Sequence, residues 1–255
     1  MQTKEFYEKY PYPARGFKTK EEFEKYSSWF YRKTKLTKKD LKGKLILDAG
    51  CGTGELSTAL ALQEKTARIF ALDLSLNSLK KAYEYKKKFD LKNLFLIEGD
   101  AKQLPFEKKF DLIIALGSIH HDKETEKAFS SLTKQLKKKG IFVVGFYNVF
   151  SRVRNKIRKN LLKLLSWGDL EKRIALARTI FPYTQHKSDS WIADKFCVPV
   201  ENHFSFEKAQ KLMSREKLKL IHSDPDIKKK GIPFKQELEM LIRKENAFFI
   251  LVGKR

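Results

Sequence analysis

The sequence predicts an α/β fold, a doubly wound and mostly parallel sheet with helices on both faces. Between residues 44 and 147, short apolar runs of strand length alternate with longer stretches of helical spacing. This order is typical of parallel sheets. The runs 45–47 and 141–144 are apolar throughout, as strands covered on both faces must be. A chain of 255 residues is long enough for one such domain and too short for two.

Residues 1–43 are expected to precede the sheet as an aromatic strap and a helix. The segment from Tyr7 to Phe17 contains two prolines, which do not continue a helix, and is predicted to be extended. Thr19 and Glu22 form a capping box, which predicts a helix that begins there and ends near Thr34.

The alternating region, 44–255, is expected to form the main domain. Strands are predicted at 44–49, 68–73, 93–98, 110–116 and 141–147, and helices at 54–64, 75–88 and 122–138. After an interruption, a helix from Ser205 and strands near 218–222 and at 247–252 are predicted to complete the sheet.

A glycine-rich loop joins the first strand to its helix. Gly50, Gly52 and Gly54 permit the positive φ angles of a sharp turn and let backbone N–H groups approach a small molecule. A dinucleotide-binding loop would have its third glycine three residues after Gly52, where this chain has Glu55. The loop therefore predicts a nucleotide-type ligand other than a dinucleotide.

The spacing acidic-x-Gly-x-Gly-x-Gly, which starts at Asp48, resembles motif I of the class I S-adenosylmethionine-dependent methyltransferases. Three further motifs follow in the family's order, at 67–73, 94–106 and 110–121. The resemblance implies a Rossmann-like sheet of seven strands with an antiparallel last strand, and an enzyme that transfers a methyl group from S-adenosylmethionine.

The resemblance also implies roles for individual residues. Asp73 would bind the ribose hydroxyls, and Asp100 would accept a hydrogen bond from the adenine amine. The implied cofactor-binding residues are Asp48, Ala49, Gly50, Cys51, Gly52, Gly54, Asp73, Leu74, Asp100, Ala101, Leu116 and Gly117.

Residues 149–204 interrupt the alternation after the fifth strand and are expected to form a helical cap over the substrate. Apolar residues recur every three or four positions from Phe150 to Leu164, with basic residues between them, so 149–165 is predicted to be a basic amphipathic helix. A second helix is predicted at 169–179. The basic face is interpreted as the solvated back of the cap, with RNA phosphates or an anionic membrane as alternatives.

Candidates for acceptor chemistry lie in the strap, the fourth-strand loop and the cap. His121 is the preferred general base and His120 the second candidate, although histidines in such loops also pack without a catalytic role. The substrate candidates are Tyr7, Tyr10, Tyr12, Tyr147, Asn148, Asp194 and Glu201. The tyrosines of the leader fit a purely structural strap equally well. No metal site is expected, because nothing fixes a ligand spacing for Asp194, Glu201 and His203.

Bulk properties restrict the compartment and the partners. The net charge of +23 suits RNA, but lysines far outnumber arginines, which favours a generally basic surface. A small-molecule acceptor is therefore favoured, with tRNA or rRNA methylation and a non-catalytic cofactor-binding scaffold as alternatives. Two cysteines, no signal peptide and no membrane-spanning segment predict a cytoplasmic protein. The oligomeric state stays open.

Overall fold

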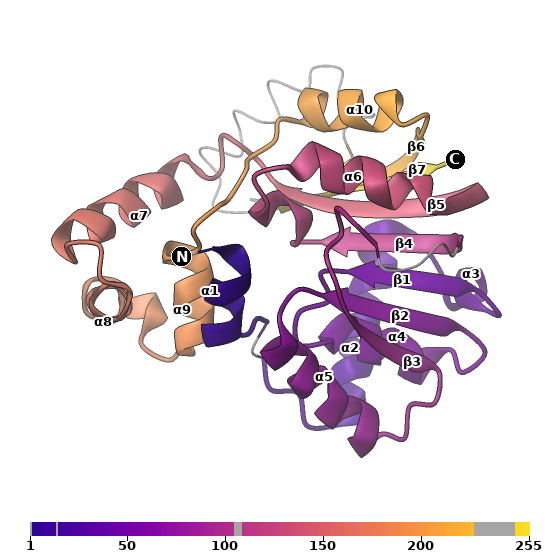
Figure 1. Cartoon of the computed structure of the whole chain (residues 1–255), viewed down its shortest axis with the longest axis horizontal. Coiled ribbons are helices and arrows are strands. Elements are labelled where there is room, and N and C mark those ends of the chain that lie inside the picture. The colour runs from indigo at the N-terminus through magenta and orange to yellow at the C-terminus, as the bar shows by residue number, and fades with distance from the viewer. Residues whose placement is uncertain (1, 14, 105–108, 227–247) are drawn as a thin grey trace.

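A computed structural model describes residues 2–13, 15–104, 109–226 and 248–255 of the chain (Figure 1). Four positions in the predicted segments, Ala14, Pro105, Phe106 and Ala247, lie outside the described residues. Helices pack on both faces of a central sheet, and further helices form a lobe at one side (Figure 1).

The sheet has seven strands in the order β3-β2-β1-β4-β5-β7-β6. Neighbours from β3 to β5 pair in parallel, and β7 lies antiparallel between β5 and β6. The strands are β1 Leu45–Ala49, β2 Arg68–Asp73, β3 Leu94–Glu98, β4 Phe110–Leu116, β5 Leu136–Tyr147, β6 Lys219–Asp224 and β7 Phe248–Lys254. This confirms the predicted fold class.

Two apolar clusters cover the two faces of the sheet. One includes residues of α6 (Thr125–Lys134) and α10 (Phe206–Arg215). The other includes residues of α2 (Lys20–Thr34), α4 (Glu55–Gln63) and α5 (Leu76–Lys88), with the short α3 (Lys38–Leu41) beside them. Because both faces are covered, the strands must be apolar on both sides.

The predicted helix at 122–138 is wrong at both ends. Helix α6 starts at Thr125 and ends at Lys134, and β5 begins at Leu136. Leu136 pairs with Phe110, whereas Ile141 pairs with Leu112, so the residues between them form an irregularity in β5. Pairing with β4 and burial of Leu136 therefore outweigh the helical pattern of the sequence.

Two helices occur where none was expected. Helix α1, Thr3–Lys9, includes the first residues of the predicted extended strap, and its Phe6 is fully buried. Helix α9, Asp189–Phe196, begins after Ser188, whose side chain accepts a hydrogen bond from the backbone of Trp191. The two helices share a third apolar cluster, so tertiary packing stabilises both.

The cap predicted from 149–204 contains α7 (Val153–Leu165), α8 (Leu170–Ile180) and α9. Most basic residues of α7, among them Lys156 and Lys163, are exposed as expected, but most of its apolar residues do not face inward. Its inward side is formed by Asn155 and Leu162, while the apolar residues Ile157 and Leu164 are exposed. Figure 1 shows α7 at the outer edge of this lobe, far from the sheet. Among the described residues, no helix combines the length and apolarity needed to cross a bilayer.

Candidate functional site

A cavity of about 290 Å³ lies at the carboxyl ends of β1, β2 and β4. Loops that follow adjacent parallel strands meet at this edge, which is where open α/β sheets bind ligands. Ten of the predicted cofactor residues line it: Asp48, Gly50, Cys51, Gly52, Asp73, Leu74, Asp100, Ala101, Leu116 and Gly117. The structure places Ala49 and Gly54 outside the wall.

The three glycines of the loop make room for other parts of the protein. All have positive φ, between 55° and 74°. A Cβ on Gly50 would lie 2.2 Å from Cβ of Ser118, and one on Gly52 would lie 2.0 Å from the Tyr12 carbonyl oxygen. Gly54 allows α4 to approach α5, where a Cβ would meet that of Ala82 at 2.5 Å. The loop thus lies close to the N-terminal segment and to the loop after β4, and it lets α4 pack closely on α5.

The backbone N–H groups of this loop already have partners within the chain. Those of Gly50 and Cys51 donate to the Leu72 carbonyl, and that of Gly52 donates to the Asp73 carboxylate. The N–H of Gly54 donates to Cys51 within the loop itself. Gly50, Cys51 and Gly52 line the cavity, while the hydrogen bonds of their N–H groups hold the loop in shape.

Two carboxylates lie at the centre of the wall. Asp48 accepts a hydrogen bond of 2.5 Å from the Ser57 hydroxyl, and burial, with a contribution from Asp73, raises the pKa of Asp48 to about 6. Asp73 accepts from the backbone of Gly52 at 2.8 Å and of Ser75 at 2.9 Å. Burial raises the pKa of Asp73 also, because it outweighs the backbone hydrogen bonds that Asp73 accepts.

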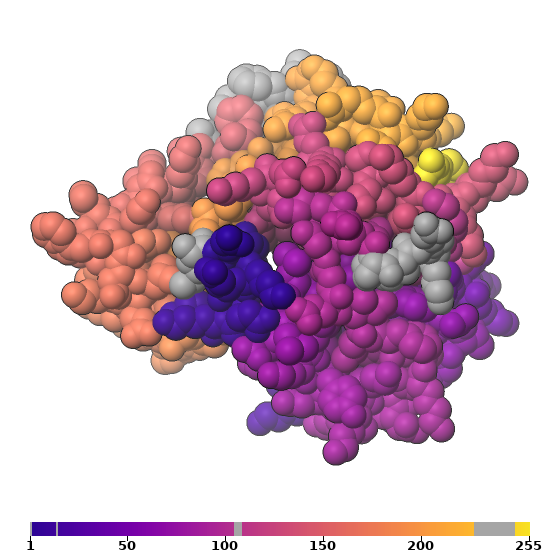
Figure 2. All heavy atoms as spheres, viewed as in Figure 1, coloured from indigo at the N-terminus to yellow at the C-terminus, as the bar shows by residue number. Residues whose placement is uncertain are grey.

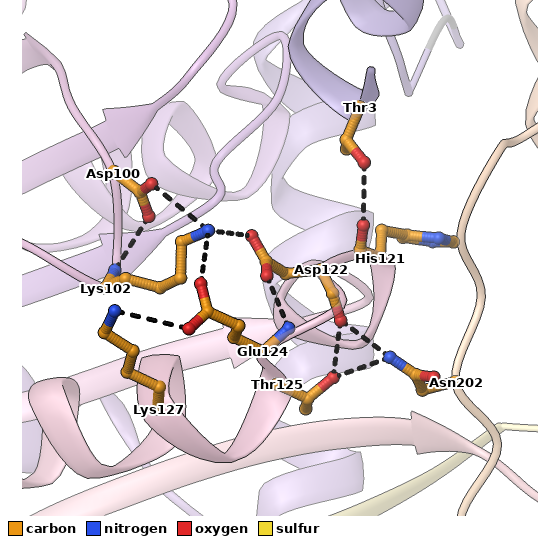
Figure 3. A network of polar contacts seen from close by, with 9 residues as sticks. All are labelled: Thr3, Asp100, Lys102, His121, Asp122, Glu124, Thr125, Lys127 and Asn202. Atoms are coloured by element: carbon orange, nitrogen blue, oxygen red, sulfur yellow. Dashed lines mark hydrogen bonds and ion pairs between the residues drawn. The ribbon is translucent and has the colours of Figure 1, made fainter. Parts of the chain in front are cut away.

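Asp100 belongs to a charged network that joins the loops after β3 and β4 (Figure 3). Its carboxylate accepts from the backbone of Lys102 at 2.8 Å. The Lys102 ammonium lies 2.9 Å from Asp122, 3.4 Å from Glu124 and 3.6 Å from Asp100. Asn202 donates to the Asp122 carbonyl and fixes this loop to the cap side of the molecule. One lysine therefore holds the cavity edge at Asp100 in place.

The N-terminal segment closes the cavity from the side of the cap. Figure 2 shows it, in indigo, between the cap lobe and the sheet. Glu8 accepts hydrogen bonds from the first backbone N–H groups of α5. The Tyr12 carbonyl accepts from the backbone of Thr53 at 3.2 Å, and Arg15 forms an ion pair with the buried Glu55. We call residues 2–15 the strap, excluding the undescribed Ala14.

The opposite end of the cavity carries polar groups from the strap and the cap. The Tyr7 hydroxyl donates to Asp194 of α9 at 2.9 Å. Burial raises the pKa of Asp194, and it raises that of Tyr147 to about 12. His121 Nδ1 lies 2.9 Å from the Val200 carbonyl, which can only accept, so Nδ1 carries a proton. In the neutral ring Nε2 is then the basic nitrogen.

Four of the residues predicted to bind or deprotonate the acceptor do not line the cavity. Tyr10 packs beside Phe6 in the cap cluster, and His120 is fully buried next to His121, where burial lowers its pKa well below the usual value. The Asn148 side chain accepts from the backbone of the following turn. The fourth is Glu201.

Glu201 belongs to a buried ion pair. Burial alone would raise its pKa, but the hydrogen bond with His203 and the charge of Arg152 outweigh burial and hold it at about 2. The Arg152 guanidinium lies 3.4 Å from the centre of the Tyr147 ring and pairs with Glu201. In the part of the chain that the structure describes, no group of three or more metal-ligating side chains could hold an ion.

Sequence reasoning missed several wall residues, among them Arg15, Tyr26, Trp29 and Phe248. Arg15 lies 4.5 Å from the Tyr26 ring centre, a cation-π contact between strap and α2. These residues come from elements that meet at the cavity only in three dimensions, and no spacing in the sequence identifies them.

The charge of the wall is opposite to that of the whole chain. Five aspartates and one arginine line the cavity, namely Asp48, Asp73, Asp100, Asp122, Asp194 and Arg15, in a chain with a net charge of +23. Asp100 and Asp122 share Lys102, whereas Asp48, Asp73 and Asp194 form no ion pair with the described residues. Carboxylates without a balancing cation favour a positively charged ligand over a phosphate.

Comparisons with known proteins agree with this geometry. A family profile described as "Methyltransferase domain" matches residues 40–242. A malonyl-[acyl-carrier protein] O-methyltransferase of Priestia megaterium is 30% identical over 171 residues, covering 66% of this chain and 58% of the relative. A ubiquinone biosynthesis O-methyltransferase of Rickettsia bellii is 27% identical over 121 residues, covering 48% of this chain and 49% of the relative. The chain thus spans about half the length of these curated relatives.

Solved structures share the fold. PKMT2 from Rickettsia typhi superposes with a TM-score of 0.68 at 15% identity, over 95% of this chain and 54% of that chain. Magnesium protoporphyrin IX methyltransferase from Synechocystis PCC 6803, solved with bound SAH, gives a TM-score of 0.56 at 17% identity, over 92% of this chain and 83% of that one. At these identities the likeness concerns the fold alone.

Proposed function

Because the chain belongs to the methyltransferase domain family, we propose that it transfers a methyl group from S-adenosylmethionine to a small-molecule acceptor. The observation that carries the proposal is the acidic cavity. S-Adenosylmethionine bears a positive sulfonium and an ammonium group, and five aspartates face the space in which it would lie. A dinucleotide, with its negative pyrophosphate, would meet repulsion there.

The residues present fit this cofactor in both charge and position. Asp73 and Asp100 follow β2 and β3, two adjacent strands, so their carboxylates can receive the ribose hydroxyls and the adenine amine. Asp48 lies deeper, below the glycine loop, at the proposed methionine end. The bound cofactor would supply an electrophilic methyl carbon, and the chain's own residues would orient it and exclude water.

The small-molecule acceptor is favoured because the strap and the cap narrow the cavity. The strap and α9 both contribute to the wall, through Tyr7, Tyr12 and Asp194, so an acceptor must fit beside these side chains. The similarity to the malonyl-[acyl-carrier protein] and ubiquinone O-methyltransferases supports an oxygen acceptor.

His121 is the proposed general base. Its Nδ1–H donates to the Val200 carbonyl, which leaves the Nε2 lone pair to take a proton. Nε2 would take the proton of the acceptor hydroxyl, while the bound cofactor would supply the methyl group. Asp194 lies near enough to His121 to stabilise the resulting imidazolium.

Two measurements test the proposal. Calorimetry with the full chain should detect S-adenosylmethionine binding, and no binding at high micromolar concentration would overturn the cofactor assignment. Transfer of labelled methyl groups to separated metabolite, RNA and protein pools should label metabolites. Label in RNA alone would overturn the acceptor class while leaving the cofactor intact.

A further inference from the structure

The outer side of the cap presents a continuous apolar stripe to solvent. It is formed by Val153, Ile157, Leu161 and Leu164 of α7, which follow one another at steps of four, four and three and so share one face of the helix. Ile157 is 63% exposed and Leu164 is 75% exposed. The opposite face of α7 already packs on the cap, where Asn155 donates to the Lys195 carbonyl. The apolar stripe therefore takes no part in the packing that holds α7 on the cap.

A large side chain is exposed just beyond the helix, after the buried Ser166. Trp167 is 95% exposed and has a φ of 53°, in the left-handed region. That region is unfavourable for a bulky side chain, and glycine or asparagine would adopt it at lower cost. Trp167 adopts it because it ends the helix, where its own N–H donates to the Leu164 carbonyl and that of Gly168 donates to the Lys163 carbonyl. The chain thus holds an indole in solvent at a position where glycine is the usual residue.

Cations border the stripe on both sides. On a helical projection, Lys156 and Lys163 lie along one border, and Arg154 and Arg158 along the other. Helix α7 contains no acidic residue. An exposed apolar stripe between two rows of cations suits a partner that is apolar inside and negatively charged at its surface.

We propose that the stripe and Trp167 dock on the surface of an anionic lipid bilayer. In this arrangement α7 lies parallel to the membrane, with its aliphatic side chains at the boundary of the acyl region. The lysine and arginine stems extend to the lipid phosphates, and the indole of Trp167 occupies the interface that tryptophan favours.

The same observations disfavour two other occupants. A second copy of the chain, packed through α7, would bring two helices without acidic residues against each other, and their cations would repel. RNA would be attracted by the cations, but its phosphates would gain nothing from exposed leucine and isoleucine.

Vesicle sedimentation with the full chain tests the proposal. Wild-type protein should bind phosphatidylcholine vesicles that contain phosphatidylglycerol, and bind pure phosphatidylcholine much more weakly. The double variant Leu164→Ser/Trp167→Ser should lose roughly tenfold or more in partitioning. The double variant Lys156→Gln/Lys163→Gln should lose roughly thirtyfold on the anionic vesicles only.

Matched controls come from α5, on the sheet domain. Tyr83 is 58% exposed there, and Tyr83→Ser should leave partitioning unchanged. Lys81→Gln/Lys87→Gln removes the same charge as the cap double variant and should change partitioning far less. Thermal melting should show that all variants fold, because the substituted side chains are exposed.

Tryptophan emission gives an independent measurement. Anionic vesicles should shift the emission to shorter wavelength, and Trp167→Phe should abolish that shift while the protein still sediments. The proposal is overturned if α5 and cap variants lose binding equally. The proposal is also overturned if the protein does not bind vesicles but binds tRNA. A protein that is a dimer in solution and is dissociated by Leu164→Ser/Trp167→Ser would overturn it too.

Discussion

Replacement of Gly52 by alanine should detach the strap from the glycine loop. The residue has a φ of 55°, and an added Cβ would lie 2.0 Å from the Tyr12 carbonyl oxygen and 3.0 Å from the Pro13 ring. The nearest atom belongs to the backbone, so no side-chain rotation can relieve the overlap. The strap must move away, and its hydrogen bonds to Thr53 are lost with it.

The expected loss of stability is the sum of two parts. Alanine in the left-handed region costs about 1–2 kcal/mol. The two hydrogen bonds between Thr53 and the strap contribute roughly 0.5–1.5 kcal/mol each. Gly52→Ala should therefore lower the free energy of unfolding by about 2–5 kcal/mol. Gly43 is the matched control, because its φ is 67° and nothing lies within 4 Å of an added Cβ. Gly43→Ala should therefore lose only about 1–2 kcal/mol, the cost of alanine in the left-handed region.

Urea unfolding measures both losses, and limited proteolysis shows whether the strap has left the loop. Gly52→Ala should be cleaved within 2–15 under conditions that leave Gly43→Ala intact. S-Adenosylmethionine affinity should fall only in the Gly52 variant, because the strap forms part of the cavity wall. Equal destabilisation of the two variants, with the strap equally protected, would refute the contact with Tyr12 as the reason for glycine.

Three further outcomes are expected. Asp73→Ala should weaken S-adenosylmethionine binding by about 1.5–3 kcal/mol in calorimetry, the range for hydrogen bonds to a charged group, and unchanged affinity would place the ribose elsewhere. Because the pKa of Asp48 is about 6, affinity for the cationic cofactor should rise as the pH increases through 6, and Asp48→Asn should flatten that profile. If both proteins keep the same profile, Asp48 does not face the cation. The pKa of Glu201 is held at about 2, below its value in the unfolded chain, so its stabilisation is present at neutral pH and is lost as the pH falls toward 2. Glu201→Gln should therefore cost about 3 kcal/mol at pH 7 and little at pH 2.5 in denaturant unfolding, and an equal cost at both pH values would contradict this.

The sheet could be predicted because its signals are local. Apolar runs such as 45–47 identify a buried strand without knowledge of their neighbours, and the glycines after β1 identify the turn. The predictions failed where a distant contact decides the structure. Leu136 belongs to β5 because it pairs with Phe110, and α1 forms with its Phe6 buried against the cap cluster.

The residues of the site divide in the same way, into those with a local sequence signal and those placed by distant contacts. Asp48, Asp73 and Asp100 lie at or near the carboxyl ends of three neighbouring strands, so one topology places all three at one cavity. Arg15 and Trp29 could not be assigned, because the strap and α2 reach the cavity only through tertiary packing. The sequence pattern of α7 also could not predict that its apolar residues are exposed. The pattern shows that these residues share one face of the helix, but not whether that face packs on the protein or contacts solvent.

The contact between Tyr7 and Asp194 joins residues that are 187 positions apart. At ordinary rates of translation, roughly ten to forty seconds separate the synthesis of these two side chains. Throughout that interval the strand ends and the glycine loop can already form, but the residues of α1 have no cap to pack against. We therefore expect strands β1 to β5 to pair first in a nascent chain. The cavity should close last, after α9 and then β7, whose Phe248 also lines the wall, have left the ribosome.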